Sequence, residues 1–214
     1  MIPKTILKPA ILFFSAFLVL CNVHAQKINI LKKVDSLISL NQFDEAHKII
    51  KVKNKRSLLG HLVYPTGQIE LLKNPNTQFT DALELFERIT KENQNDSVSY
   101  QANLGMGLLH LAQGTVIKAT PYLDKANSLA YSLKSVKKII ASEHYLSELG
   151  LKLGDFGALV THNNKALNYL RKNKALEIKL TPRIYNYKAS LMHFTAKPDS
   201  ANFYFKKAIA TIDT

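Results

Sequence analysis

The six residues NQFDEA at positions 41–46 mark a junction between two amphipathic helices. Before them, Val34 and Ile38 lie four residues apart on one helical face, and after them the chain continues as an apolar-periodic helix. An aromatic residue, Phe43, stands three residues before the small residue Ala46. This pattern predicts a helical hairpin in which one helix ends and the next begins within residues 41–46, with close approach of the two helices at Ala46.

Four later segments repeat this arrangement: QFTDA, GTVIKA, GDFGAL and KPDSA, which end at Ala82, Ala119, Leu159 and Ala201. Counted from Ala46, the successive spacings are 36, 37, 40 and 42 residues. Two short helices and two turns have this length, so the spacing predicts about five stacked helical hairpins over residues 26–214. The alternative is an irregular helical bundle that shares the spacing by chance.

These segments resemble the tetratricopeptide repeat family, in which a Gly-x-Tyr/Phe-x-x-Ala hinge precedes an aromatic and then a small residue on the second helix. Gly107 stands where the family packs its helices closely. The resemblance implies an all-α fold, a right-handed superhelical solenoid of about five antiparallel hairpins. The positions that match are Ile50, Phe86, Leu123 and Phe205 for the aromatic or large apolar residue, and Ala126, Ala166 and Ala208 for the small residue.

The chain departs from the family pattern in several places. It contains no tryptophan, the first repeat has Lys53 where a small residue is usual, and the fourth has Asn163 at the aromatic position. In the second hairpin, Pro65 and Gly67 fall where the first helix should run. Proline is comfortable only in the first turn of a helix, so we expect that helix to start late or to kink.

Residues 1–25 read as a secretory signal peptide: a basic start with Lys4 and Lys8, an apolar run, and a small-residue exit at Ala25. The apolar run of about ten residues is short for a membrane anchor, which needs about twenty. Cys21 allows a lipoprotein signal as a further alternative, but the preceding Leu20 is larger than the residue usual there. We therefore expect export to the periplasm or the extracellular space.

The net charge of the exported chain limits the classes of partner that it suits. Removal of Lys4 and Lys8 leaves 27 basic against 16 acidic residues, a net charge of +11. Export makes nucleic acid an unsuitable partner, and a basic surface implies at most weak attraction to anionic membranes. The basic residues concentrate on second helices and turns, at Lys48, Lys51, Lys53, Lys55, Arg56, Lys134, Lys137, Lys138, Lys165, Arg171, Lys172 and Lys174.

No enzyme motif is present. The sequence lacks a phosphate-binding loop, a His-Glu-x-x-His helix, a calcium loop and a nucleophile elbow. The only cysteine is Cys21, and no two histidines stand three or four residues apart. Glu143, His144 and Glu148 come closest to a site, and helical spacing predicts a surface pair of His144 with Glu148. We expect neither catalysis nor a metal or other cofactor.

Stacked hairpins bind extended partners on the concave surface that their first helices line. We therefore expect a scaffold that binds protein or peptide there. The family pattern places these residues near the groove: Gln101, Leu104, Leu108, His144, Glu148, Leu151, Arg183, Asn186 and Ser190.

The last predicted helix carries more apolar residues than packing on one neighbouring helix would use: Phe203, Tyr204, Phe205, Ile209 and Ile212. A second copy of the chain, a separate partner or further polypeptide would cover this face. The last possibility leads to an alternative function. Degenerate hairpins after a signal peptide resemble the extracytoplasmic sensor region of membrane signalling proteins, such as histidine kinases or helix-turn-helix regulators.

Overall fold

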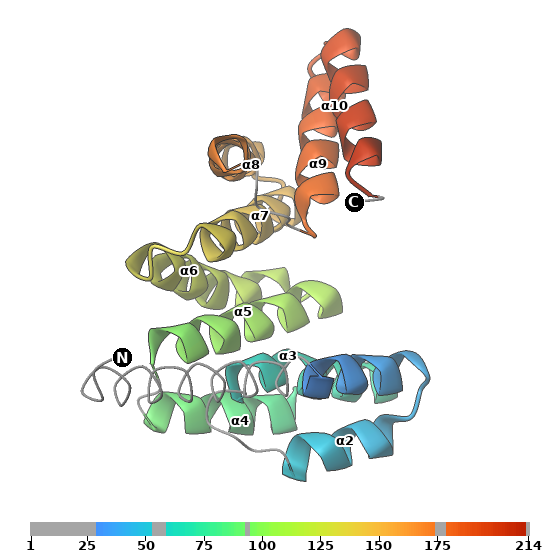
Figure 1. Cartoon of the computed structure of the whole chain (residues 1–214), viewed down its shortest axis with the longest axis vertical. Coiled ribbons are helices and arrows are strands. Elements are labelled where there is room, and N and C mark those ends of the chain that lie inside the picture. Colours follow the sequence, from blue (N-terminus) through green and yellow to red (C-terminus); the bar gives the residue numbers. More distant parts are fainter. Residues whose placement is uncertain (1–28, 53–58, 93–94, 174–178, 213–214) are drawn as a thin grey trace, which may run out of the picture. The chain divides into compact units, whose positions relative to one another are not determined.

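The fold is that of a computed structural model, which describes residues 29–52, 59–92, 95–173 and 179–212. Every regular element in these ranges is a helix, and the described residues form no strand (Figure 1). The all-α prediction is therefore confirmed. The predicted signal peptide, together with Lys53, Lys55, Arg56 and Lys174, lies outside the described residues.

The chain divides into two compact units, residues 1–58 and residues 59–214. In the first unit, a helix over residues 29–39 is followed by α2 (Phe43–Val52). Val34 on the first helix and Ala46 on α2 are fully buried. Asn41, in the turn, adopts a left-handed conformation with φ 58°. This unit is the helical hairpin predicted from residues 41–46.

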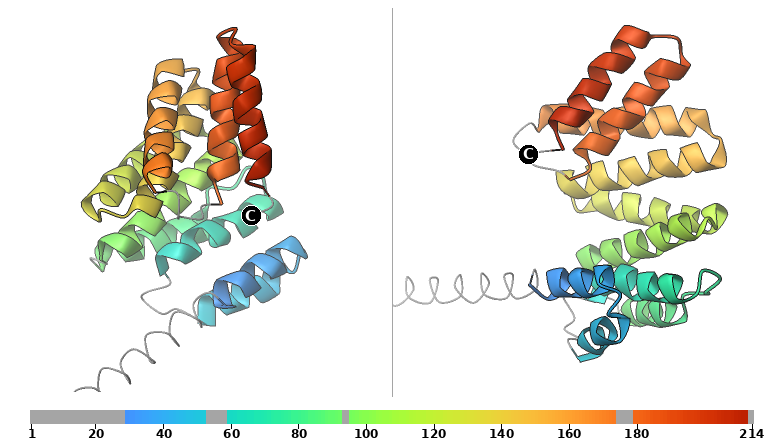
Figure 2. Two further views of the ribbon diagram at one scale, coloured as in Figure 1. Left: turned by 45° about the horizontal axis from the view of Figure 1, so that its top comes forward. Right: turned by 90° about the vertical axis from the view of Figure 1, so that its right-hand side faces the viewer.

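The second unit consists of helix pairs formed by consecutive helices (Figure 2). Consecutive helices pack against one another, and α3 packs even more extensively against α5 than against α4. The pairs are α3 (Leu59–Lys73) with α4 (Thr80–Lys91), α5 (Asp96–Gln113) with α6 (Val116–Ser132), α7 (Val136–Leu153) with α8 (Phe156–Lys172), and α9 (Thr181–Phe194) with α10 (Pro198–Ala210).

The predicted hinge positions lie at equivalent places in these pairs. Each of them falls in the first turn of the second helix of its pair, and each is buried. Phe79, which precedes α4, has φ 56°, and Gly114 and Gly154, which end α5 and α7, have φ 83° and 74°. Glycine adopts this conformation without steric cost, so it suits the sharp reversal between two helices. The hinge residues are Ala46, Ala82, Ala119, Leu159 and Ala201.

Close helix packing depends on glycines in the first helices, among them Gly107 and Gly150. A Cβ atom on Gly107 would lie 2.5 Å from Cδ2 of Leu123 on α6, as the resemblance led us to expect at Gly107. A Cβ atom on Gly150 of α7 would lie 2.7 Å from the backbone nitrogen of Leu159 on α8. Both distances are shorter than van der Waals contact, so a larger residue would displace the Leu123 side chain at Gly107 and the backbone of α8 at Gly150.

We expected the second hairpin's first helix to start late or to kink, and the late start is wrong. α3 begins at Leu59 and runs through both Pro65 and Gly67. Pro65 lacks an N–H group, so the backbone ladder loses one hydrogen bond there. The helix is nevertheless held by its packing: residues 62, 63 and 69 are buried, and Gly67 lies against Leu109 of α5. Tertiary packing has overridden the local preference of proline.

Asn163 explains one departure from the family pattern. It is fully buried on α8, and its Nδ2 atom donates a hydrogen bond of 3.1 Å to the backbone oxygen of Ile184 on α9. The amide therefore ties two consecutive helix pairs together where an aromatic residue would fill space.

The described helices include none with the length and apolarity of a membrane-spanning segment.

Candidate functional site

The predicted groove residues come from three first helices, α5, α7 and α9. On α5, Gln101 is half-buried, and Leu104 and Leu108 pack against the cores between α5, α6 and α7. These two leucines therefore take part in helix packing, in addition to any role at the surface. On α7, Glu148 is half-buried and Leu151 is exposed; on α9, Arg183 and Asn186 are exposed and Ser190 is half-buried.

His144 does not line a surface, which corrects two expectations about it. Its side chain is fully buried, so it forms neither a surface pair with Glu148 nor part of an exposed groove. Its ring lies 5.1 Å from the ring of Tyr145 and 5.3 Å from that of Tyr187 on α9, the latter nearly parallel at 30°. Neither ring nitrogen has a hydrogen-bond partner. Burial and then the charge of Arg183 lower the pKa of His144 to about 4, so the imidazole is neutral at pH 7.

Two tyrosines, Tyr145 and Tyr187, cover His144 and are themselves half-buried. Burial, followed by the charge of Glu148, raises the pKa of Tyr187 to about 12, and burial also raises the pKa of Tyr145. Both hydroxyl groups are therefore protonated and can donate hydrogen bonds at neutral pH. Arg183 supplies a cation and Glu148 an anion close to both rings.

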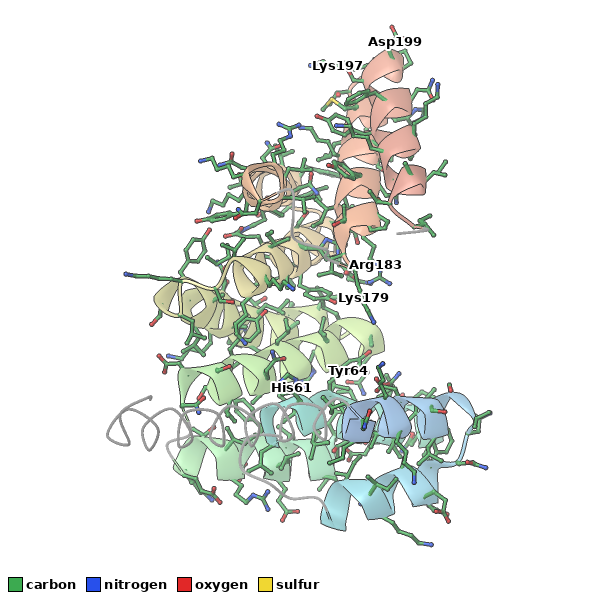
Figure 3. The ribbon with its side chains drawn as sticks, in the orientation of Figure 1. His61, Tyr64, Lys179, Arg183, Lys197 and Asp199 are labelled. Carbon is green, nitrogen blue, oxygen red and sulfur yellow. The ribbon has the colours of Figure 1, made fainter. Side chains whose placement is uncertain are left out.

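The tyrosine surface extends toward α3. Tyr145 interacts electrostatically with Tyr64, which Figure 3 shows on α3, and with Arg183, near the start of α9. Side chains from α3, α7 and α9 thus combine ring faces, hydroxyl groups and one guanidinium. Such a surface offers stacking and hydrogen bonding to a polypeptide.

Sequence reasoning missed the tyrosines by one helical position. Tyr145 follows His144, and Tyr187 follows Asn186, in the predicted groove set. A one-residue error in frame rotates a side chain by about 100° around the helix, which exchanges a buried residue for its partly exposed neighbour. The signal that could have identified them is the amphipathic character of tyrosine, which suits a partly exposed contact surface better than histidine between apolar neighbours.

A polar network lies inside the α6–α8 region. Glu143 is fully buried on α7; its Oε1 atom accepts a hydrogen bond of 2.8 Å from the Tyr131 hydroxyl, and its Oε2 atom lies 2.7 Å from Nδ1 of His162. Burial opposes the charge of Glu143, but the bonds from His162 and Tyr131 outweigh it and lower the pKa of the carboxyl group. The network joins three consecutive helices and is closed to solvent on the glutamate side, so we assign it to stability.

The described residues contain no group of three or more histidine, cysteine, aspartate or glutamate side chains that could hold a metal ion. Lys48, Lys165, Arg171 and Lys172 lie on α2 and α8, as expected for second helices, and Lys134 lies in a turn. Lys137 and Lys138 instead belong to the first turn of α7, a first helix.

The apolar residues of the last helix are largely open to solvent. Phe203 is 52% exposed, Phe205 38%, Ile209 65% and Ile212, just beyond the end of α10, 66%. Tyr204 is half-buried, and its hydroxyl accepts a 2.7 Å hydrogen bond from Arg171 Nη2 of α8.

Comparisons with protein-family models, with curated proteins and with solved structures give no match to this chain.

Proposed function

We propose that this protein is a tetratricopeptide-like helical-repeat scaffold that binds a protein or peptide partner on the surface formed by α3, α7 and α9. The observation that carries the proposal is the cluster around His144, in which Tyr145, Tyr187, Glu148 and Arg183 from two helices meet. Aromatic and arginine side chains dominate the energetics of protein interfaces. The equivalent hinge positions and the packing of each helix on its chain neighbours support a repeat architecture.

The residue types around the cluster favour binding over catalysis. A catalytic site needs a nucleophile or a base within hydrogen-bond reach of a reacting group. In this cluster the imidazole is buried beneath two tyrosine rings, and the exposed groups are a guanidinium and apolar or amide side chains. We therefore propose that the protein binds its partner and leaves it chemically unchanged. We also propose that the chain is exported and binds this partner in the periplasm or the extracellular space.

A random-peptide display selection against the purified protein tests this function. Peptides that are enriched should bind at least tenfold more weakly to Leu151→Ser and to Arg183→Gln, because these substitutions remove an exposed apolar contact and the cation. Leu153→Ser is the matched control, since Leu153 is 47% exposed on the same helix but points elsewhere. Failure to enrich any peptide, or equal binding to all these variants, would contradict the proposal.

The exposed apolar face of α10 supports a second proposal, that a second copy of the chain covers it. Apolar side chains grouped on one helix are typical of interaction surfaces. The alternative function, an input region of a membrane signalling protein, would cover the same face with further polypeptide. The state of association in solution separates the two, because a covering second copy makes the chain a dimer or larger species.

A further inference from the structure

An open cleft of about 520 Å³ lies along the α5–α6 hairpin. Its lining residues are Asn103 and His110 on α5, and Lys118, Pro121, Tyr122 and Lys125 on α6. None of them belongs to the predicted groove set or to the tyrosine cluster around His144. The cleft is therefore a second candidate binding surface, separate from the one proposed above.

A block of aromatic rings forms the floor of the cleft. The rings of His110 and Tyr122 are stacked, 5.6 Å apart at 19°. The Phe79 ring meets His110 edge-on at 5.5 Å, and the Phe86 ring of α4 meets Tyr122 edge-on at 5.4 Å. Phe79 is 1% exposed, so the block is anchored in the core. A ligand that binds there loses little free energy to reorganisation of the protein.

Two unpaired cations flank this floor. Lys118 and Lys125 are exposed, form no ion pair within the described part of the chain, and share the cleft with no carboxylate. They stand two helical turns apart on α6, a distance of about 10 Å along the axis. On antiparallel α5, His110 and Asn103 have the same spacing, so each end of the cleft holds one lysine and one nitrogen-bearing side chain.

Electrostatics supports an anionic ligand. Burial, and then the charge of Lys118, lower the pKa of His110, so its imidazole is neutral at pH 7 and adds ring surface rather than charge. Nδ1 of His110 lies 2.9 Å from the Thr115 hydroxyl, which fixes the orientation of the ring. The cations therefore stand only at the two ends, over a central surface made by Pro121 and Tyr122.

We propose that this cleft binds an acidic peptide segment of a partner protein, with two carboxylates about 9 Å apart. In the polyproline II conformation, residues three apart lie on the same side and are separated by about 9 Å, which matches the spacing of the two lysines. Aromatic-lined hollows are a common docking surface for such segments. A flat anionic membrane fits less well, because the apolar surface lies at the floor of a hollow between the lysines and does not project from it.

Fluorescence anisotropy with a labelled, end-blocked peptide containing Glu-Pro-Ala-Glu tests the proposal on the full chain. We expect saturable binding, weakened about tenfold by Lys118→Gln and by Lys125→Gln, and none to the Gln-Pro-Ala-Gln peptide. Lys137→Gln and Lys172→Gln are matched controls, since both lysines are exposed and their substitution changes the net charge equally. Leu151→Ser should bind as the native protein does, which separates this site from the tyrosine surface.

Nuclear magnetic resonance provides a second readout. A carboxylate beside Lys118 offsets the charge of that lysine and favours the protonated imidazole, so the acidic peptide should raise the pKa of His110 in the native protein, and the same rise should need about tenfold more peptide in Lys118→Gln.

Three outcomes would overturn the proposal. One is absence of binding to the native protein. Another is equal weakening of peptide binding by the control substitutions Lys137→Gln and Lys172→Gln, which would show that only the net charge of the protein matters. In the third, the native protein binds phosphatidylserine vesicles but not the peptide, and the cleft variants lose the binding to vesicles. This result would assign the cleft to a membrane surface.

Discussion

Glu143 Oε2 lies 2.7 Å from His162 Nδ1 in a pair whose glutamate is fully buried. Because the pKa of Glu143 is lowered in the folded state, its contribution to the free energy of unfolding is present above the ordinary carboxyl value and is lost as pH falls through the folded value. We expect Glu143→Gln to lower the free energy of unfolding by about 2 kcal/mol at pH 7.

Urea unfolding between pH 7 and pH 3 measures this effect, with Glu84→Gln as the control at an exposed position on α4. The difference between native protein and Glu143→Gln should shrink below pH 4.5, the ordinary value for the carboxyl group. A difference that stays constant across this range would show that the charge of Glu143 is unimportant.

His144 gives a separate pH dependence. Its pKa of about 4 lies below the ordinary 6.5, so the folded state binds fewer protons and stability falls as pH is lowered from 6.5 to 4, by roughly 3 kcal/mol in all. We expect His144→Phe to remove this loss and, because both ring nitrogens lack partners, to raise stability at pH 7 by about 1 kcal/mol. Thermal melting at pH 7 and pH 5 checks both statements, and a destabilised His144→Phe would mean that the imidazole has a polar role.

Ala119 is fully buried in the first turn of α6. Phenylalanine in its place would overpack the contact with α5 and lower the free energy of unfolding by roughly 1 to 3 kcal/mol or more. Ile117→Phe is the control, because Ile117 is 79% exposed two residues earlier. Chemical denaturation distinguishes the two variants, and equal stabilities would refute the hinge position.

Gly150 and Gly107 differ in what a methyl group would meet. Gly150→Ala places Cβ against the backbone of Leu159, which cannot move without shifting α8, whereas Gly107→Ala meets the movable side chain of Leu123. We expect Gly150→Ala to cost about 2 kcal/mol and Gly107→Ala clearly less. Parallel denaturation curves test the order, and the reverse order would contradict this account of the α7–α8 contact.

The association of the chain depends on α10 if a second copy covers its apolar face. Light scattering over a concentration series should then give a dimer or larger species, and Ile209→Lys should return it to a monomer because a charge would have to be buried. Lys206→Gln is the control, an exposed residue of the same helix. A native protein that stays monomeric and binds hydrophobic dyes would favour the alternative, coverage by further polypeptide in a signalling protein.

Local sequence determined where the helices begin and turn. The hinge residues, four alanines and Leu159, mark the first turns of second helices because close approach of two helices allows only small or well-fitted side chains there. The late start expected from Pro65 was wrong because it rested on a local rule of the same kind. Packing of α3 against α5 then outweighed the hydrogen bond that proline removes.

Only the tertiary structure decided which side chains of α7 face inward. His144 and Tyr145 are neighbours in sequence, yet His144 is fully buried, with its ring stacked on that of Tyr187 from α9, whereas Tyr145 is partly exposed. The pairing of Glu143 with His162 likewise requires α8 to lie against α7. Helical periodicity is encoded within each segment, whereas the burial and pKa of a side chain depend on residues far along the chain. A one-residue error in the helical frame is enough to exchange a buried position for an exposed one.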